Sequence, residues 1–406
     1  MYDVIVIGGG AAGMMAAGTA ARHGKTVLLL EKNNLLGKKL MITGKGRCNV
    51  TNMCDMQTFL AAITANPKFL YSAYSRFTSQ DTVDFFTSLG VNMKTERGNR
   101  VFPASDRAAD IVNALKKYIS DNGVSAKKAA VSGIQTSDGK VTGVVLSGGS
   151  VLDCTSAIIC TGGLSYPLTG STGDGYAMAR ACGHNIVPPT PSLVPLNTVE
   201  PWVTKLQGLS LKNVDITLRE DDQIIYREQG EMLFTHFGVS GPVILSLSAH
   251  IKDIAAHKYT ITIDLKPALD LKTLDARLLR DFDANINRDF ANALSKLLPQ
   301  KLIPIIIDLC GIDPNKKVHQ ITKTERTALL RLLKDLPLTI KSMRPIDEAI
   351  ITKGGVDVSG VDPSTMQSKL IHGLYFAGEV LDTDAYTGGF NLQIAFSTGH
   401  LAANNC

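Results

Sequence analysis

The residues with the clearest chemical use lie at the start of the chain, where Gly8-Gly9-Gly10-Ala11-Ala12-Gly13 fits the pattern G-x-G-x-x-G. The pattern follows a β-branched apolar run at residues 2–7 and precedes an Ala- and Met-rich segment at 14–23, which predicts a strand, a turn and a helix. At such a turn the glycines permit a tight bend, a close approach of a diphosphate to the backbone, and close packing of the helix. The helix N-terminus then binds the diphosphate of a dinucleotide.

An acid stands where the ribose of that dinucleotide would lie. Glu31 closes a second apolar run at residues 26–30, and its carboxylate is placed to accept hydrogen bonds from the ribose hydroxyls and to repel the extra phosphate of NADP. A glycine-rich turn alone also occurs for structural reasons, but strand, glycines, helix, strand and acid in register are far more specific. The sequence predicts a dinucleotide site, and the choice is between FAD and NAD.

Three features favour FAD. First, glycines, cations and polar residues follow Glu31, where the longer flavin dinucleotide must pass: Lys32, Gly37, Lys38, Lys39, Thr43, Gly44, Gly46, Arg47, Cys48 and Asn49. Second, residues 157–163, ending in Thr161-Gly162-Gly163, resemble the strand-plus-(A/C)-T-G-G motif of flavoproteins with two dinucleotide-binding domains. Third, residues 373–379 resemble their C-terminal motif, in which a strand ends at a glycine and an acid, here Gly378 and Glu379. An NAD-only dehydrogenase needs neither motif.

Few side chains qualify for catalysis, because the flavin ring itself carries the hydride. In residues 386–391, Gly388 and Gly389 before a helix start would let backbone N–H groups approach the pyrimidine edge of the flavin, although a helix start also needs flexible residues for its own sake. Tyr386 and Asp384 are polar groups beside the expected flavin, and the imidazole of His236 is of a type that moves protons. A structural role stays open for each of the three side chains.

The cysteines point away from other chemistries. Cys48 and Cys54 have the spacing C-x₅-C, which differs from the redox-active pairs of flavin disulfide reductases, and there is no second G-x-G-x-x-G to hold NAD(P)H. No Cys/His cluster has metal-ligand spacing, so we expect no metal. The odd total of seven scattered cysteines indicates reduced thiols, and no apolar stretch approaches the ~20 residues of a membrane span. We therefore expect a cytoplasmic protein without a membrane partner.

The charge balance is mild. A formal net charge of +5 over 406 residues suits binding of phosphates but falls short of a nucleic-acid footprint. Basic residues are frequent between Lys266 and Lys334, yet acids such as Asp281 and Asp289 lie among them, as on a solvated surface. RNA is therefore a possible partner but not the favoured one, and the oligomeric state is not predicted.

The pattern of elements predicts an α/β fold with a Rossmann-type FAD-binding domain. Three prolines in residues 187–191 mark a domain exit, and mostly strands are expected from there to about 270. Apolar residues recur every four positions from Leu274 to Leu298, which predicts one long helix. Ser79 and Ser105 are expected to cap two earlier helices. We expect an FAD-binding domain at 1–190 and 345–406, an inserted β-rich domain at 191–270 and 336–344, and a small helical insert at 271–335.

Four longer strings resemble the YhiN/BaiN-type family of FAD-dependent flavoproteins, and the resemblance runs essentially from end to end. They are GKGRCNVTN at 44–52, RVFP at 100–103, GEMLFTHFGVSGP at 230–242 and YTGGFNLQIA at 386–395. The resemblance implies that the inserted domain is barrel-like. It also implies non-covalent FAD contacts at the first glycine turn, Glu31 and the loop after it, the strand around Val131, the Gly162 turn, and the stretch from Gly378 through Phe390, Asn391 and Leu392 to Gln393.

The resemblance gives no secure substrate, because members of this family are connected with different small-molecule redox reactions and with RNA-base reduction. Our main hypothesis is an FAD-dependent oxidoreductase that transfers a hydride between a small molecule and the flavin, with NAD(P)H or oxygen as a transient redox partner. The alternatives are a flavin-dependent enzyme that reduces or otherwise modifies an RNA base, and a non-enzymatic flavin-binding sensor.

Overall fold

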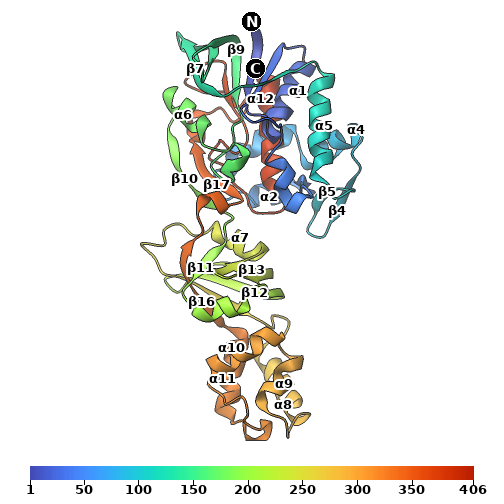
Figure 1. The fold of residues 1–406 in the computed structure, drawn as a ribbon, viewed down its shortest axis with the longest axis vertical. Helices are drawn as coiled ribbons and strands as arrows, with labels where there is room; N and C mark the ends of the chain where they lie inside the picture. The colour runs from blue at the N-terminus through green and yellow to red at the C-terminus, as the bar shows by residue number, and fades with distance from the viewer. The chain divides into compact units, whose positions relative to one another are not determined.

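The computed structural model describes residues 1–406, and the chain divides into two compact units (Figure 1). The first unit contains residues 1–192 and 345–406, and the second contains residues 193–344. The chain leaves the first unit after Ser192 and returns at Pro345, so the second unit is an insertion in the sequence. None of the helices combines the length and the apolar character needed to span a lipid bilayer.

The first unit is built on a largely parallel sheet, which confirms the Rossmann-type class. β1 lies between β2 and β9, β6 extends the sheet beyond β2, and β18 pairs with the C-terminal half of β9. A hairpin of β7 and β8 pairs antiparallel with the N-terminal half of β9. The strands are β1 (Tyr2–Ile7), β2 (Val27–Glu31), β6 (Ser125–Lys128), β7 (Val131–Ser137), β8 (Lys140–Leu146), β9 (Val151–Ile159) and β18 (Leu374–Phe376).

The central strands are buried along most of their length, as expected when both faces of a parallel sheet are covered. Helix α1 (Ala11–Arg22) packs against α12 (Phe390–Asn405) and α5 (Ala108–Asp121). The backbones of α1 and α12 come close together, because a Cβ on Gly399 would lie 2.5 Å from the carbonyl oxygen of Ala12. This contact joins the N-terminal and C-terminal parts of the chain in one core.

Smaller elements complete the first unit. They are α2 (Met56–Ala61), α3 (Tyr71–Arg76), α4 (Ser79–Ser88), α6 (Asp174–Ala181), a sheet of β3 (Thr51–Asn52), β5 (Arg100–Pro103) and β4 (Met93–Glu96), and a two-stranded ribbon of β10 (Ile186–Ser192) and β17 (Ile351–Val356). Two expected helix caps are wrong. Thr78, not Ser79, caps α4 through a capping box with Asp81. The N-cap of α5 is Arg107, not Ser105, although the Ser105 hydroxyl accepts from Arg107 N and donates to Asp110.

The second unit contains a closed antiparallel barrel, in the order β11-β14-β13-β12-β15-β16. Its strands surround a core of alternating apolar residues, as β15 shows with every second residue buried. The strands are β11 (Leu196–Thr198), β12 (Ser210–Glu220), β13 (Gln223–Phe234), β14 (Gly238–Ser240), β15 (Tyr259–Asp264) and β16 (Leu336–Met343). Helix α7 (Pro242–Ser248), in a region expected to be strands, packs on β13.

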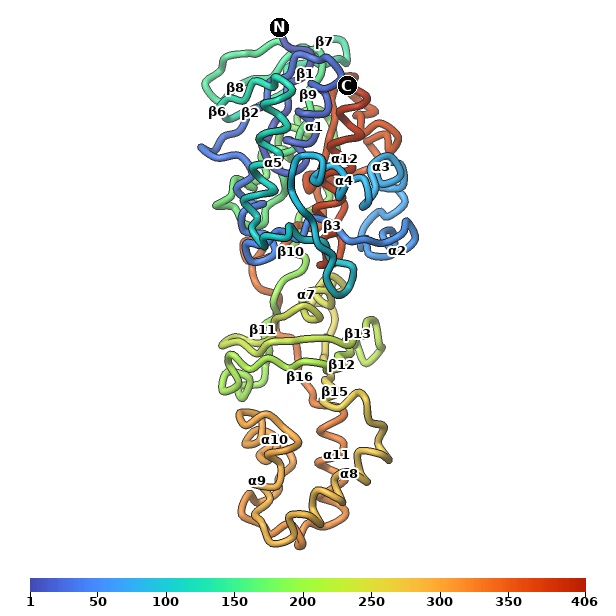
Figure 2. Tube along the Cα trace, turned by 90° about the vertical axis from the view of Figure 1, so that its right-hand side faces the viewer, coloured from blue at the N-terminus to red at the C-terminus, as the bar shows by residue number.

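Figure 2 shows the helices that lie between β15 and β16 in the sequence. The single helix expected from Leu274 to Leu298 is wrong, because α8 ends at Asp283 and α9 starts only at Phe290. Between the two helices the backbone bonds with another segment, since Arg288 O accepts from Val318 N (3.1 Å) and Ile286 O accepts from His319 N (3.3 Å). The four helices are α8 (Leu271–Asp283), α9 (Phe290–Ala293), α10 (Ile303–Cys310) and α11 (Lys323–Lys334).

Candidate cofactor and active site

The glycine turn after β1 has the shape that a diphosphate requires. Gly8 has φ +102°, and a Cβ there would lie 2.5 Å from Cys160 O; a Cβ on Gly13 would lie 1.8 Å from Gly8 O. Above Gly10, by contrast, there is open space. No side chain caps α1, and its first backbone bond runs from Met14 N to Gly10 O (3.0 Å). The backbone N–H groups at the start of the helix, including those of Ala11 and Ala12, therefore have no partner within the helix. They form a free helix N-terminus, which suits an anion.

Glu31 lies at the end of β2, beside this turn. Its Oε2 accepts a hydrogen bond from Gly9 N (2.8 Å), and its Oε1 accepts from both N and Nδ2 of Asn33 (2.8 Å each). A carboxylate offers about four acceptor sites, about two on each oxygen. Because Oε2 accepts one bond in this structure, about one of its sites remains for a ribose hydroxyl. Ala129 N donates to Glu31 O (3.0 Å), so the segment that leads into Val131 runs beside the end of β2. Glu31 thus both holds the turn and remains available to a ligand.

An ion-pair network joins three of the expected FAD segments. Lys39 Nζ contacts Glu379 Oε2 (2.6 Å) and donates to Ser165 Oγ (2.7 Å), and Ser165 Oγ donates to Glu379 Oε1 (2.9 Å). Thr352 N donates to the same Oε1 (3.0 Å). The network connects the loop after Glu31, the loop after Gly162-Gly163, strand β17 and the end of β18.

The neighbouring lysines have partners of their own. Lys32 pairs with Asp174 (2.6 Å), and Lys38 Nζ donates to Leu168 O (2.5 Å). Gly37, between these segments, adopts φ +70° and donates its N–H to Gly9 O (2.8 Å). The loop after β2 is thereby fixed along the glycine turn.

The start of α12 forms a second uncapped helix N-terminus. Gly389 has φ +101°, and a Cβ there would lie 2.4 Å from the backbone of Thr51, so only glycine fits. No side chain caps the helix, and its first bond runs from Gln393 N to Gly389 O (3.1 Å). The backbone N–H groups around Phe390, Asn391 and Leu392 are therefore available for an electron-rich edge of a ligand.

The side chains of this helix start hold the structure. Asn391 bonds back to the preceding loop, accepting from Ala385 N (3.0 Å) and donating to Ala385 O (2.7 Å). Gln393 is fully buried; its Oε1 accepts from Thr51 Oγ1 (2.6 Å) and Thr82 Oγ1 (2.8 Å). Its Nε2 donates to Phe77 O and Ser397 Oγ (2.9 Å each). The amide group of Gln393 thus has no bonding capacity left, and its bonds fix the first turns of α12 against Thr51, Thr82 and Phe77.

The loop at 43–49 is similarly braced from within. Arg47 contacts Glu96 and Asp106 (2.5 Å each), and its guanidinium lies 4.1 Å from the ring centroid of Phe102. Thr43 O accepts from the N–H of Cys48, and Gly44 and Gly46 both adopt positive φ. The charge of Arg47 is thus neutralised within the chain.

Two polar atoms in the expected FAD segments would gain from a ligand. Asn49 Oδ1 and Thr161 Oγ1 are buried and have no hydrogen-bond partner, and both belong to the expected FAD segments. Buried polar atoms without a partner are uncommon and costly. These two atoms, the open space at Gly10 and the two free helix N-termini together fit a large, polar, anionic cofactor.

The three catalytic candidates have different surroundings. Asp384 is fully buried, and its Oδ2 accepts from Ser192 Oγ (2.7 Å) while Oδ1 has no partner. Tyr386, which lies in the same loop as Asp384, is half-buried, and its backbone N–H donates to the O of Ala62 at the end of α2 (3.0 Å). The structure brings these two residues to the start of α12. His236 belongs to the second unit, where its ring lies 4.9 Å from that of Phe237.

The cysteines are unsuited to redox chemistry. All seven are free thiols. Burial raises the pKa of Cys48 to about 11, and it also raises the pKa of the half-buried Cys54. Since the thiolate is the reactive form, the raised pKa values disfavour a role for Cys48 and Cys54 as a redox-active cysteine pair beside a flavin.

Some residues of the site had no signal in the sequence. Ser165 and Thr352 bond to Glu379 but carry no motif, and Thr352 lies far along the chain from the other segments. Tyr176 has a buried hydroxyl without a partner, and its pKa is raised by burial and then by the charge of Glu379. Only the tertiary structure shows that these side chains converge.

Comparison with known proteins identifies the family of this chain. The family described as HI0933-like protein Rossmann domain matches residues 2–405. A 3-dehydro-bile acid delta(4,6)-reductase of Clostridium scindens is 31% identical over 98% of this chain and 97% of its own length. A ribosomal RNA dihydrouridine synthase of Escherichia coli is 31% identical over 100% and 98%.

Among solved structures, a 3-ketosteroid-delta4-(5alpha)-dehydrogenase of Rhodococcus jostii has a TM-score of 0.53 at 15% identity, over 99% of this chain and 96% of its own. A flavocytochrome c3 fumarate reductase has a TM-score of 0.52 at 17% identity, over 100% and 78%. These two likenesses concern the fold. The chain belongs to the HI0933-like family. It is an FAD-dependent oxidoreductase.

Proposed function

We propose that this protein uses FAD to reduce a carbon–carbon double bond conjugated with a carbonyl group. The observation that carries the proposal is shared by two relatives that align over nearly the whole chain. One is named as a reductase of delta(4,6) bonds in a 3-dehydro bile acid, and the other as a synthase of dihydrouridine. Both names describe hydrogen added across a double bond that a carbonyl activates.

The chain's own residues supply the binding and orientation that this chemistry needs. The amide groups at the start of α1 would hold the FAD diphosphate, and Glu31 would accept hydrogen bonds from the ribose. The amide groups at the start of α12, after Gly389, would stabilise negative charge at the flavin's pyrimidine edge. Bound FAD supplies the hydride. Tyr386 is our candidate to donate the proton that completes the reduction, and buried Asp384 would position the loop that carries it.

We propose reduced nicotinamide, NADH or NADPH, as a transient electron donor. The chain has one G-x-G-x-x-G turn, which the FAD site uses, so a second dinucleotide would bind without a Rossmann fingerprint of its own. Mixing the oxidised protein with each nicotinamide under anaerobic conditions and following flavin absorbance tests this part. If neither reduced nicotinamide bleaches the flavin, the donor assignment is wrong.

The acceptor is tested from the reduced protein. After stoichiometric reduction with dithionite, we expect a conjugated enone such as 4-androstene-3,17-dione or cyclohexenone to reoxidise the flavin, and the matching saturated ketones to leave it reduced. Mass spectrometry of the product would show the gain of two hydrogens. Equal reoxidation by saturated ketones, or none by any enone or uridine-containing RNA, would contradict the proposal.

RNA is the second candidate for the acceptor, because a relative named as a ribosomal RNA dihydrouridine synthase covers the entire chain. A uracil base has the same activated double bond. Incubating the reduced protein with ribosomal RNA and with cyclohexenone in parallel separates the two, and RNA binding should weaken steeply with salt. Dihydrouridine formation without enone reduction would favour the RNA assignment.

A further inference from the structure

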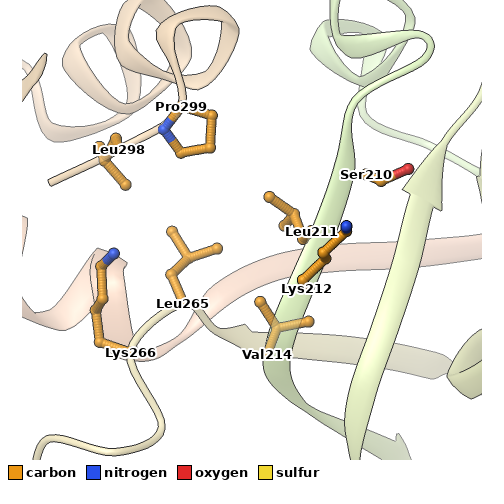
Figure 3. Close-up of a pocket in the computed structure, with 8 residues that line it drawn as sticks. All are labelled: Ser210, Leu211, Lys212, Val214, Leu265, Lys266, Leu298 and Pro299. Atoms are coloured by element: carbon orange, nitrogen blue, oxygen red, sulfur yellow. The ribbon is translucent and has the colours of Figure 1, made fainter. Parts of the chain in front are cut away.

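A cavity of about 200 Å³ lies within the second unit, apart from the residues assigned to FAD (Figure 3). It is lined by the first half of β12, the residues after β15, and the turn between α9 and α10. The lining residues are Ser210, Leu211, Lys212, Val214, Leu265, Lys266, Leu298 and Pro299. Its volume is below the roughly 300 Å³ at which pockets for drug-sized ligands begin, so a ligand here must be small.

A β-bulge shapes the wall formed by β12. The pairing of β12 with β13 shifts between Leu211 and Val214, and Asn213 adopts φ +56°. The extra residue lets Leu211 and Val214 both be buried at the cavity, although their spacing would place them on opposite faces of a regular strand. Bulges that re-aim side chains are frequent beside binding sites.

Two lysines give the cavity its charge. Figure 3 shows Lys212 and Lys266 on opposite sides of the apolar group that includes Leu265. Neither ammonium group takes part in an ion pair or hydrogen bond, although Lys266 is half-buried. Burial, and then the charge of Arg277, lowers the pKa of Lys266. An unpaired cation that is partly withdrawn from water is expected to gain from an anionic partner.

The nearest acid is already neutralised by another lysine. Asp264 accepts a hydrogen bond from Lys266 N (2.8 Å), but its carboxylate is paired with Lys334. Lys334 Nζ also donates to the carbonyl oxygens of Lys266 (3.2 Å) and Leu269 (2.7 Å), which fixes it in place. The local balance at the cavity is therefore positive.

From the apolar walls, the small volume and the two unpaired cations, we infer that this cavity binds a small amphipathic anion, with one carboxylate or phosphate head and a short apolar body. The head would lie beside the half-buried Lys266, and the apolar body would lie against Leu265, Val214 and Leu211, toward the exposed Lys212. This site is independent of the proposed redox reaction.

Isothermal titration of the full-length, FAD-loaded protein tests the inference with hexanoate and hexyl phosphate, and the two probes distinguish a carboxylate from a phosphate head. Hexanol and hexylammonium share the apolar body but lack the negative charge. We expect saturable binding of at least one anion and none of hexanol or hexylammonium. Absence of binding by both anions, or equal binding of hexanol, would overturn the inference; binding of inorganic phosphate as tightly as hexyl phosphate would also do so, since the apolar walls would then contribute nothing.

Substitution of Lys266 tests whether the anion binds at this cavity. Lys266→Met should lower the affinity for the anion by about tenfold or more, equivalent to ~1.4 kcal/mol. Lys266→Arg should keep most of the affinity, and Lys272→Met, on the exposed surface of α8, is the matched control. Unchanged affinity in Lys266→Met would place the ligand elsewhere and overturn the inference.

Chemical labelling gives a readout that does not depend on substitution. Because its pKa is lowered, Lys266 should be acylated by acetic anhydride at neutral pH faster than the exposed Lys272. Saturating hexanoate or hexyl phosphate should then protect Lys266, as seen by peptide mass spectrometry. No protection at saturation would contradict binding at this cavity.

Discussion

Lys39 and Glu379 form an ion pair with an Nζ–Oε2 distance of 2.6 Å, although 340 residues separate them in the sequence. Both side chains are mostly buried, with 23% and 13% of their surfaces exposed. The pair therefore joins the first and last parts of the chain at the expected cofactor site.

Breaking this pair should destabilise the first unit. Glu379→Gln leaves Lys39 without its partner ion and weakens the bonds from Ser165 and Thr352 N, which we expect to lower the free energy of unfolding by about 2 kcal/mol. Urea unfolding of the FAD-free protein measures this. In a double-mutant cycle with Lys39→Met, the two effects should be clearly non-additive. Additive effects would show that the ion pair contributes little.

Two glycines of the same turn should respond differently to alanine. At Gly10 a Cβ meets no atom within 4 Å, so Gly10→Ala should change the free energy of unfolding by no more than about 0.5 kcal/mol. It should nevertheless lower FAD affinity by about tenfold or more, because the methyl group enters the space assigned to the diphosphate. At Gly13 a Cβ would lie 1.8 Å from Gly8 O, so Gly13→Ala should destabilise the fold by more than about 3 kcal/mol. Thermal unfolding and flavin titration of both variants check this. Normal FAD affinity in Gly10→Ala would show that the diphosphate does not bind at this turn.

Glu31→Ala should strongly lower FAD occupancy, because it removes both the ribose acceptor and the bond from Gly9 N that holds the turn. The flavin-to-protein absorbance ratio after purification measures occupancy. Asp222→Asn, in the exposed turn between β12 and β13, is the control and should keep full occupancy. A fully yellow Glu31→Ala protein would count against the ribose role.

Cys48 should make stability depend on alkaline pH. Burial raises its pKa from 9.0 to about 11, so above pH 9 the unfolded thiol loses its proton while the folded thiol keeps it. The unfolded state then binds fewer protons, and the free energy of unfolding should fall by about 2–3 kcal/mol as the pH rises toward 11. Urea unfolding across this range should show a shallower decline in Cys48→Ala. An identical pH dependence in the two proteins would contradict this account.

The sequence predicted those parts of the fold whose signals are local. The strand, glycine turn and helix at residues 2–22, the hairpin around Asp138-Gly139, and the strand before Gly378 are all present. The prediction of one long helix was wrong, because a four-residue repeat of apolar residues does not reveal where the helical backbone is interrupted. Leu294 and Leu298 are buried as expected, but Ile286 is 51% exposed where the chain leaves the helix.

Within the candidate site, the glycines were predictable because the backbone conformation leaves no room for a side chain. Gly8, Gly13 and Gly389 occupy positions where a Cβ would collide, and such positions leave a glycine in the sequence. Side-chain partners were not predictable in the same way. Arg47, one of the expected FAD-binding residues, forms ion pairs with Glu96 and Asp106, and no local pattern reveals those partners.

The ribbon of β10 and β17 flanks the insertion: the chain leaves the first unit after Ser192, at the end of β10, and returns at Pro345, six residues before β17 begins. Ser192, the last residue of β10, donates to Asp384, and Thr352 of β17 donates to Glu379, so each exit strand is anchored on the C-terminal segment by residues of the first unit alone. Exchanging residues 193–344 for the corresponding segment of a relative would preserve both anchors. The hydrogen bonds that hold the two ribbon strands therefore do not depend on the side chains of the inserted unit.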